Sequence, residues 1–259
     1  MGTLLQIRHR MIRKLSCLAE GIYYVSSDEL GAANYKRNDF HHFHKNPDDL
    51  QQKVRTLSDL ILYVRTSFFR PQKGDIRVRE GQILWHFNRT GPETICENQG
   101  NCGGVSSMLN FLLRDKYEEV GFIAFADKQG GHVFNYIRHE GYYYFVDLLN
   151  YLYASRTMEH YGTMIYQADS LQRYADYYRS RDEREITLMV AYEAEQVLPM
   201  GRYLGKPMMF FPKGSQLQVL HESPLEGIVV QHKPVYHCPL PLNNCLDATN
   251  SNGPAECEG

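Results

Sequence analysis

The chain has 259 residues, of which 43% are hydrophobic and 22% are charged. This composition is typical of a soluble globular protein and argues against a largely disordered chain or a bundle of membrane helices. The 28 basic and 30 acidic residues give a formal net charge of −2, so charge gives no reason to expect nucleic acid or an anionic membrane as a partner. A chain of this length can bury a core around a water-excluding site.

Two features of the sequence predict a cytoplasmic protein with no membrane partner. No stretch has the roughly 18 unbroken apolar residues that a membrane-spanning helix needs. The apolar run near the N-terminus is interrupted by basic residues before it reaches the length of a signal-peptide core: Arg8, Arg10, Arg13 and Lys14. In a reducing compartment we expect the six cysteines to be thiols rather than a disulfide framework.

Two helical patterns open the chain. Apolar residues recur at spacings of three and four from Leu4 to Leu18, which predicts an amphipathic N-terminal helix. A second helix is predicted from Asp48 to Phe69, because Asn46-Pro47 is a start signal and the apolar residues that follow share one face. Arg70-Pro71 is expected to end this helix.

In the middle of the chain the secondary-structure signal is weak up to residue 101 and clear from residue 102 onward. Between Gln72 and Asn101, Ile83–Phe87 fits a short strand or a buried turn, and Gly91-Pro92 is expected to break the chain. From Cys102 to Arg114, apolar residues at helical spacing predict a helix that begins at or beside the cysteine.

Strand patterns dominate the rest of the chain. Three runs of β-forming residues follow the predicted helix: Val120–Ala126, His132–Arg138 and Tyr142–Leu148. A turn at Glu140-Gly141 predicts that the last two runs form a hairpin. A helix over Asp169–Arg181 and short strands at 208–211 and 227–230 follow. Helices packed against an antiparallel sheet define an α+β fold.

We expect one domain over residues 1–237. Its parts are N-terminal helices over 1–70, a core with the candidate site over 95–150, and a helical and β extension over 151–237. The tail 238–259 is rich in Pro, Asn and Gly and short of large apolar residues, so it is expected to be loosely held.

Cys102 is the first candidate for chemistry. A thiol attacks a carbonyl as thiolate, and a cysteine with its ordinary pKa of about 8.5 is mostly protonated at neutral pH. The N-terminal end of a helix favours the thiolate, and so does a nearby imidazolium. Cys102 follows the turn-forming stretch 98–101, stands where the helix should begin, and precedes Gly103-Gly104. Cys102 is therefore the predicted nucleophile.

His132 and Asp147 are the predicted partners of this nucleophile. His132 begins a predicted strand after Gly130-Gly131, at a sheet end where its ring can face a helix start. Asp147 closes the next strand, and the two residues stand at similar distances from the turn at Glu140-Gly141. Their side chains should therefore meet across the hairpin. An aspartate there orients the imidazole and stabilises its charged form, as in a catalytic triad.

These residues carry a resemblance to a known family. Residues 98–150 resemble the core of the transglutaminase-like superfamily of papain-type folds: NQGNCGGVSSMLNFLLRDKYEEVGFIAFADKQGGHVFNYIRHEGYYYFVDLLN. A glycine-flanked cysteine opens a helix, and a histidine and an aspartate follow on successive strands. The separations of 30 residues (132 − 102) and 15 residues (147 − 132) are also similar to those of such domains. The resemblance implies a transglutaminase-like or papain-like cysteine fold.

The resemblance also implies thioester chemistry. Cys102 would attack a carboxamide or peptide carbonyl, His132 would protonate the leaving amine, and water or an amine would resolve the acyl-enzyme. The backbone N–H of Cys102 would form part of an oxyanion hole, and Gln99 or the indole of Trp85 would supply the second donor. The implied enzyme is a peptidase, an amidase or a transglutaminase that acts on a peptide or protein and needs no cofactor.

Three further residues are predicted to contact the substrate. Gly103 and Gly131 adjoin the nucleophile and the histidine without bulky side chains, and Tyr144 belongs to a tyrosine run that can line a groove near the triad. Tyr142, Tyr143, Tyr151 and Tyr153 complete this tyrosine-rich region, and strand alternation must turn half of it toward the core.

Two alternative functions use the same residues. A catalytically idle member of the fold would bind a peptide or protein partner in the same cleft. An arylamine-type acetyltransferase that uses coenzyme A has the same triad order, but the arginine and glycine pair expected before its cysteine is absent, because Gln99-Gly100-Asn101 stand there.

Other cysteine and histidine patterns are weaker. Cys96 is the rival nucleophile, but it precedes the predicted helix and has no glycine flank. Five residues separate Cys96 from Cys102, more than the two to four usual in zinc sites, and the next close pair is Cys238 and Cys245. A dense histidine cluster lies in a polar segment and is most simply solvated: His41, His42 and His44. We therefore predict no metal site.

Overall fold

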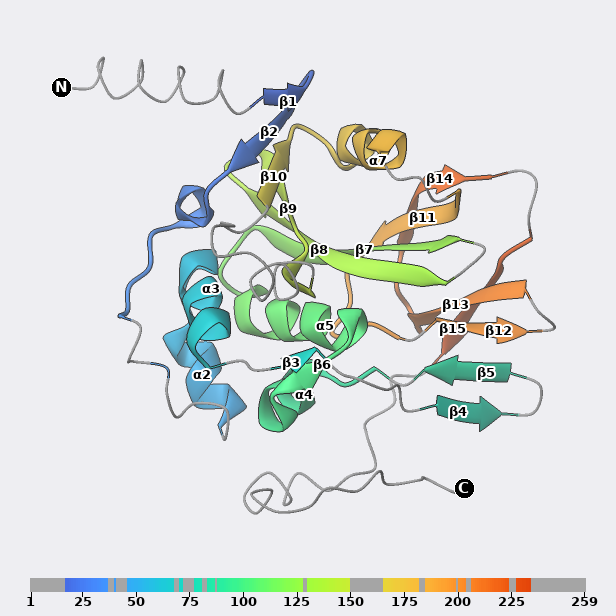
Figure 1. Cartoon of the computed structure of the whole chain (residues 1–259), viewed down its shortest axis with the longest axis horizontal. Coiled ribbons are helices and arrows are strands. Elements are labelled where there is room, and N and C mark those ends of the chain that lie inside the picture. Colours follow the sequence, from blue (N-terminus) through green and yellow to red (C-terminus); the bar gives the residue numbers. More distant parts are fainter. Residues whose placement is uncertain are drawn as a thin grey trace.

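The computed structural model describes most of the chain between residues 17 and 233. The described residues are 17–36, 40, 46–67, 70–71, 77–80, 83–86, 88–127, 130–149, 165–181, 185–198, 200–203, 206–223 and 227–233. They form an α+β fold in which helices pack against an antiparallel sheet (Figure 1). None of the helices in these ranges is long and apolar enough to cross a membrane.

The main sheet has eight strands in the order β1-β2-β10-β9-β8-β7-β11-β14. Every neighbouring pair is antiparallel. The strands are β1 (Cys17–Ala19), β2 (Ile22–Val25), β7 (Glu119–Asp127), β8 (Gly131–His139), β9 (Tyr142–Val146), β10 (Ile165–Ala168), β11 (Ile186–Tyr192) and β14 (Leu217–Glu222). The three strands predicted over 120–148 are thus confirmed as neighbours at the centre of this sheet.

A second sheet of five strands lies beside the main sheet (Figure 1). Its order is β15-β13-β12-β5-β4, with a parallel pairing only between β13 and β15 among these strands. The strands are β4 (Arg77–Glu80), β5 (Ile83–His86), β12 (Met200–Tyr203), β13 (Lys206–Pro212) and β15 (Val229–Lys233). A short parallel pair, β3 (Arg70–Pro71) and β6 (Gln99–Gly100), leads into the helix that follows.

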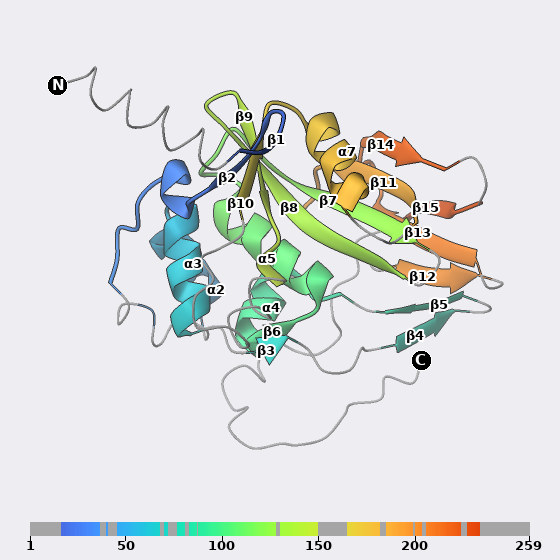
Figure 2. The same ribbon diagram turned by 45° about the horizontal axis from the view of Figure 1, so that its top comes forward.

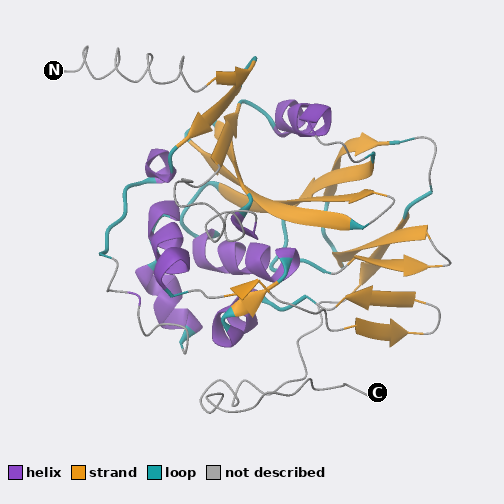
Figure 3. Cartoon of the chain, viewed as in Figure 1, coloured by secondary structure: helices purple, strands orange, loops and turns teal. Residues whose placement is uncertain are grey.

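Helices cover both faces of the main sheet (Figures 2 and 3). Alternate residues of β8 point to opposite faces. Ile137 joins a core formed with α3 (Leu57–Thr66) and α5 (Cys102–Leu113), whereas Phe134 and Tyr136 join an aromatic core under α7 (Leu171–Arg181). The remaining helices are α2 (Pro47–Lys53), α4 (Gly91–Glu97) and the 3-10 helix η1 (Ser27–Leu30).

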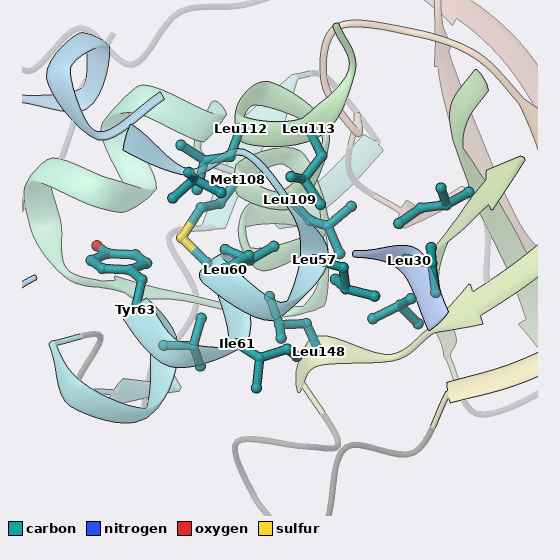
Figure 4. Close-up of a cluster of buried hydrophobic side chains, with 14 of the residues drawn as sticks. Leu30, Leu57, Leu60, Ile61, Tyr63, Met108, Leu109, Leu112, Leu113 and Leu148 are labelled. Atoms are coloured by element: carbon teal, nitrogen blue, oxygen red, sulfur yellow. The ribbon is translucent and has the colours of Figure 1, made fainter. Parts of the chain in front are cut away.

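The core between α3 and α5 fixes the helix that begins at Cys102. Leu57, Leu60 and Tyr63 of α3 meet Met108 and Leu112 of α5, and all five side chains are buried (Figure 4). Burial of each large apolar side chain contributes roughly 1.5–3 kcal/mol. The apolar stripe predicted from the sequence is therefore the face by which α5 is held.

The single helix predicted over 48–69 is wrong, because the chain forms two helices there. Val54 and Thr56 have extended backbone between α2 and α3. The Thr56 side chain accepts from the N–H of Asp59, whose carboxylate accepts in turn from the N–H of Thr56 at 3.2 Å. This carboxylate is buried and also accepts from the N–H of Asn34 at 2.7 Å. The capping box and a contact with a distant segment together break the helix.

The break predicted at Gly91-Pro92 is also wrong, because these residues begin α4. Thr90 caps this helix, and a capping box joins it to Glu93. Proline is favourable in the first helical turn, where its missing N–H has no acceptor to lose. Asn98 ends α4 in the left-handed conformation, with a φ of 51°.

The other predictions divide into three groups. The helix at Cys102, the hairpin and the helix over 169–181 are confirmed, and of the strand or buried turn expected at 83–87 the structure has a strand over Ile83–His86. The N-terminal helix over residues 4–18 falls on residues outside the described ranges, except that Cys17–Ala19 is a strand. The tail 238–259 also lies outside them. β1 and β2 precede the described helices and join the main sheet, whereas the sequence patterns predicted strands only after the helices at 48–69 and 102–114.

Candidate active site

Cys102 is the first residue of α5. Asn101 caps the helix with an extended backbone, and its Oδ1 accepts a hydrogen bond from the N–H of Gly104 at 2.9 Å. The first N–H groups of a helix have no acceptor within it, so this end favours negative charge. The first turn of α5 contains no acidic residue. The sulfur of Cys102 therefore lies at an electropositive helix end.

Gly103 and Gly104 let neighbouring segments approach this helix start closely. A Cβ atom on Gly103 would lie 2.1 Å from Asn88 Nδ2, and one on Gly104 would lie 2.9 Å from Thr94 Oγ1. Both distances are shorter than Cβ contacts in proteins. The glycines are needed because the segment before α4, and α4 itself, pack against the turn that carries Cys102.

Polar contacts fix α5 to the strand that carries His132. The hydroxyl of Ser106 donates to the carbonyl of Val133 at 3.3 Å, and Asn135 Nδ2 donates to the carbonyl of Ser106 at 3.2 Å. These groups are buried, and loss of a buried hydrogen-bond partner is costly. The position of Cys102 relative to β8 is therefore set one helical turn away from the sulfur.

His132 and Asp147 meet across the β8–β9 hairpin, as predicted. The register pairs Asn135 with Val146; continued by one residue, it sets Asp147 opposite Phe134, two residues along from His132. Side chains at such diagonal positions can touch. His132 Nε2 donates to Asp147 Oδ2 at 2.6 Å, with the two side chains 12% and 19% exposed. The pair is thus largely removed from water.

The environment of His132 favours the imidazolium form. Burial is the largest single effect and lowers the pKa of His132, but the charge of Asp147 and its hydrogen bond raise the pKa, and the nearby Cys102 side chain acts in the same direction. Together they raise the pKa of His132 from 6.5 to about 10. Because Nε2 faces Asp147, Nδ1 is the ring nitrogen left for the sulfur.

Aromatic rings hold the imidazole on its other sides. The ring of Phe125 lies edge-on to His132 with centroids 5.9 Å apart, and the ring of Phe134 lies 6.1 Å away. Tyr178 of α7 packs against both phenylalanines, at 5.4 and 5.5 Å. Packing of this kind restricts the rotamers of the histidine, so α7 supports the site without supplying a triad member.

Tyr192 is a polar residue on the Cys102 side of the sheet. Its ring is buried against Phe122 and Phe211, in the cluster on which Cys102 packs. Burial first, and then the charge of Cys102, raise the pKa of Tyr192 above its usual value. Its hydroxyl has no hydrogen-bond partner among the described residues, so the phenol remains a protonated donor.

The other predicted site residues lie in different surroundings. Gln99 is in β6, three residues before Cys102, and is half-buried. Trp85 is in β5, where its backbone pairs with Val78 and Gly201, and its side chain is outside the described part. Gly131 is exposed and begins β8, next to His132.

Tyr144 is placed in the core rather than in a groove. Its side chain is 3% exposed, and its hydroxyl accepts a hydrogen bond from Gln167 Nε2 at 2.8 Å. Tyr142 is exposed but lies at the opposite end of β9 from Asp147, where it pairs with His139. Tyr151 and Tyr153 are outside the described ranges. Neither Tyr142 nor Tyr144 therefore offers a substrate surface at the triad.

The structure describes only part of the rival cysteine and metal patterns. Cys96 lies in α4, and neither Cys96 nor Cys102 is in a disulfide. No group of three potential metal ligands occurs among the described residues. The cluster at residues 41–44 and the pair Cys238 and Cys245 fall outside them.

The fold and the site together define an α+β protein with an ordered Cys–His–Asp arrangement at the junction of a helix start and a sheet. Comparisons with protein-family models, with curated proteins and with solved structures find no match to the chain. Asn88 and Tyr192 are polar neighbours of Cys102 that no motif in the sequence identifies. The two glycines after Cys102 were the available signal, because they indicate that another segment approaches that turn.

Proposed function

We propose that this chain is a cysteine-nucleophile acyl-transfer enzyme with a transglutaminase-like or papain-like cysteine fold. Its reaction would be that of a peptidase or amidase, or of a transglutaminase, on a peptide or protein substrate. One observation carries the proposal: His132 bonds to Asp147 at 2.6 Å through Nε2, and its pKa is raised further by the nearby side chain of Cys102 at the start of α5. A nucleophile, a base and a residue that orients the base are the three members of a catalytic triad for this chemistry.

The first half-reaction forms a thioester. The thiolate of Cys102 attacks the carbonyl carbon of an amide, so a C–S bond forms and the carbonyl oxygen becomes an oxyanion. Collapse of this intermediate breaks the C–N bond, while Nδ1–H of the His132 imidazolium gives its proton to the leaving amine. The acyl group is left on sulfur and the imidazole is neutral. The raised pKa of His132 supports its role as the proton donor.

The second half-reaction regenerates the enzyme. Water or an amine attacks the thioester carbonyl, and His132 accepts a proton from it. The C–S bond breaks and the thiolate of Cys102 leaves, paired again with the imidazolium. In both steps Asp147 keeps Nε2–H in place, which leaves Nδ1 directed toward the sulfur and stabilises the positive charge on the ring.

Labelling and acylation of the full chain test the proposal. Iodoacetamide should alkylate Cys102 rapidly near neutral pH; Cys102→Ala should lose this fast labelling, and the matched control Cys96→Ala should retain it. Incubation with p-nitrophenyl acetate should place one acetyl group on Cys102, detectable by peptide mass spectrometry. Release of that group by water indicates a hydrolase, and its transfer to an added primary amine indicates a transglutaminase.

One result would contradict the proposal. If Cys102 and Cys96 are alkylated at equal rates across about pH 5 to 9, Cys102 has the reactivity of an ordinary thiol. Together with the absence of acetylation, that result would favour a catalytically idle domain that binds a peptide or protein partner.

A further inference from the structure

Asn88 is a buried amide beside the start of α5. It lies between β5 and α4 and is 6% exposed. No step of the thioester chemistry described above uses it. A buried amide normally has hydrogen-bond partners for both its oxygen and its nitrogen.

Two hydrogen bonds determine which way the Asn88 amide points. The N–H of Gly104 donates to the side chain of Asn101, so the atom that accepts must be Oδ1. The other amide atom of Asn101, Nδ2, is therefore the one that faces Asn88. Asn101 Nδ2 then donates to Asn88 at 2.7 Å, so the receiving atom must be Oδ1. The nitrogen of Asn88 is therefore the atom turned toward Gly103.

The nitrogen of Asn88 lies against the residue that follows the nucleophile. A Cβ atom on Gly103 would be 2.1 Å from Asn88 Nδ2 and 2.3 Å from its Cγ, so the amide occupies the space of the missing side chain. Asn88 Nδ2 has no hydrogen-bond partner among the residues whose positions are described. A second donor, the N–H of Cys102, has no acceptor within the helix.

We propose that Asn88 is the side-chain donor of the oxyanion hole, and that its Nδ2 and the N–H of Cys102 stabilise the oxyanion formed when Cys102 attacks a carbonyl. This inference rests on the proposed function. The donor is pre-positioned, because Asn101 holds its oxygen and the same Asn101 caps the helix of the nucleophile. Donors fixed in this way stabilise a developing charge without rearrangement.

Tyr192 is a further rival donor, beside Gln99 and Trp85, which were predicted from the sequence. The hydroxyl of Tyr192 is also unpaired among the described residues, and its ring lies in the cluster on which Cys102 packs. It projects from β11, however, whereas Asn88 lies against the residue bonded to Cys102. Asn88 and Tyr192 can be separated by removing each donor alone.

The test compares two reactions of the same sulfur in the full chain. Alkylation of Cys102 by iodoacetamide forms no oxyanion, whereas acetylation by p-nitrophenyl acetate does. For Asn88→Ala we expect the ratio of acetylation rate to alkylation rate to fall about 100-fold, the usual effect of removing one oxyanion donor. Asn88→Asp keeps an acceptor for Asn101 and should show the same fall, and Tyr192→Phe should leave the ratio unchanged.

The outcomes are distinct. If the ratio is unchanged in both Asn88 variants, or falls only in Tyr192→Phe, the inference is overturned and the proposed function stands. If both rates fall equally, Asn88 only shapes the helix start and the inference is again overturned. If Cys102 of the unaltered protein is alkylated but never acetylated, the proposed function itself fails.

Discussion

Replacement of Asp147 by asparagine keeps the shape of the side chain and removes a charge 2.6 Å from His132 Nε2. The rise in the pKa of His132 from 6.5 to about 10 corresponds to roughly 5 kcal/mol of preference for the charged ring. Asp147 supplies the two largest contributions that raise this pKa, and burial continues to oppose them. In Asp147→Asn we therefore expect the pKa of His132 to fall toward or below 6.5.

The change should appear in titration, stability and reactivity. In the unaltered protein the charged ring contributes stability that is fully present below pH 6.5 and is lost as the pH rises through about 10. Urea unfolding at several pH values should show the free energy of unfolding decreasing as the pH rises. In Asp147→Asn this dependence on pH should be weaker. Acetylation of Cys102 near neutral pH should slow by roughly 10²–10⁴-fold, since the ring loses both its orientation and its charge.

An NMR titration of isotopically labelled histidine measures the pKa of His132 directly and so tests this prediction. Asp169→Asn is the matched control, because it removes an exposed carboxylate that pairs with Arg173, and it should leave the titration of His132 unchanged. A His132 signal that titrates near 6.5 in the unaltered protein, or identically in Asp147→Asn, would show that Asp147 does not raise the pKa of His132.

Three further predictions concern the surroundings of the site. Gly103→Ala should lower the free energy of unfolding by about 1–3 kcal/mol, because the new methyl group overlaps Asn88; Gly130→Ala, where a Cβ meets nothing within 4 Å, should be nearly neutral in the same urea titration. Asp59→Ala should cost about 1–3 kcal/mol, because it removes the capping box and leaves the part-buried N–H groups of Asn34 and Thr56 without their acceptor. A loss below about 0.5 kcal/mol would contradict the capping role. Tyr144→Phe should lose about 1 kcal/mol with its hydrogen bond yet acetylate Cys102 at the original rate; a slower rate would indicate contact with the site.

The central part of the site was predictable because its signals are local. The helix at Cys102 has an apolar stripe and an asparagine cap. The hairpin has Glu140 and Gly141 at its turn, both with positive φ, of 50° and 77°, which suits the twist of antiparallel strands. Once the turn is known, the register brings His132 and Asp147 together without further information.

The remaining elements depend on contacts between distant segments. α2 and α3 look like one helix because their apolar residues enter the same core, and the break depends on Asn34, more than twenty residues away. β11 is buried at every position, so its sequence lacks the alternation that marks a strand with one solvent-facing side. The pattern Thr90-x-x-Glu93 is typical of a capping box and indicates a helix start. The sequence nevertheless predicted a break there, because Gly-Pro is usually found in turns.

Because His132 lies on a central strand, the candidate site is disrupted only when most of the domain unfolds. β8 is hydrogen-bonded to β7 on one side and to β9 on the other, with helices over both faces of the sheet. Amide hydrogens in such a strand exchange with solvent chiefly through global unfolding, whereas those of the outer strands β1 and β14 exchange through local opening. In rising denaturant the triad should therefore persist until the whole domain unfolds, after the sheet margins have begun to exchange freely.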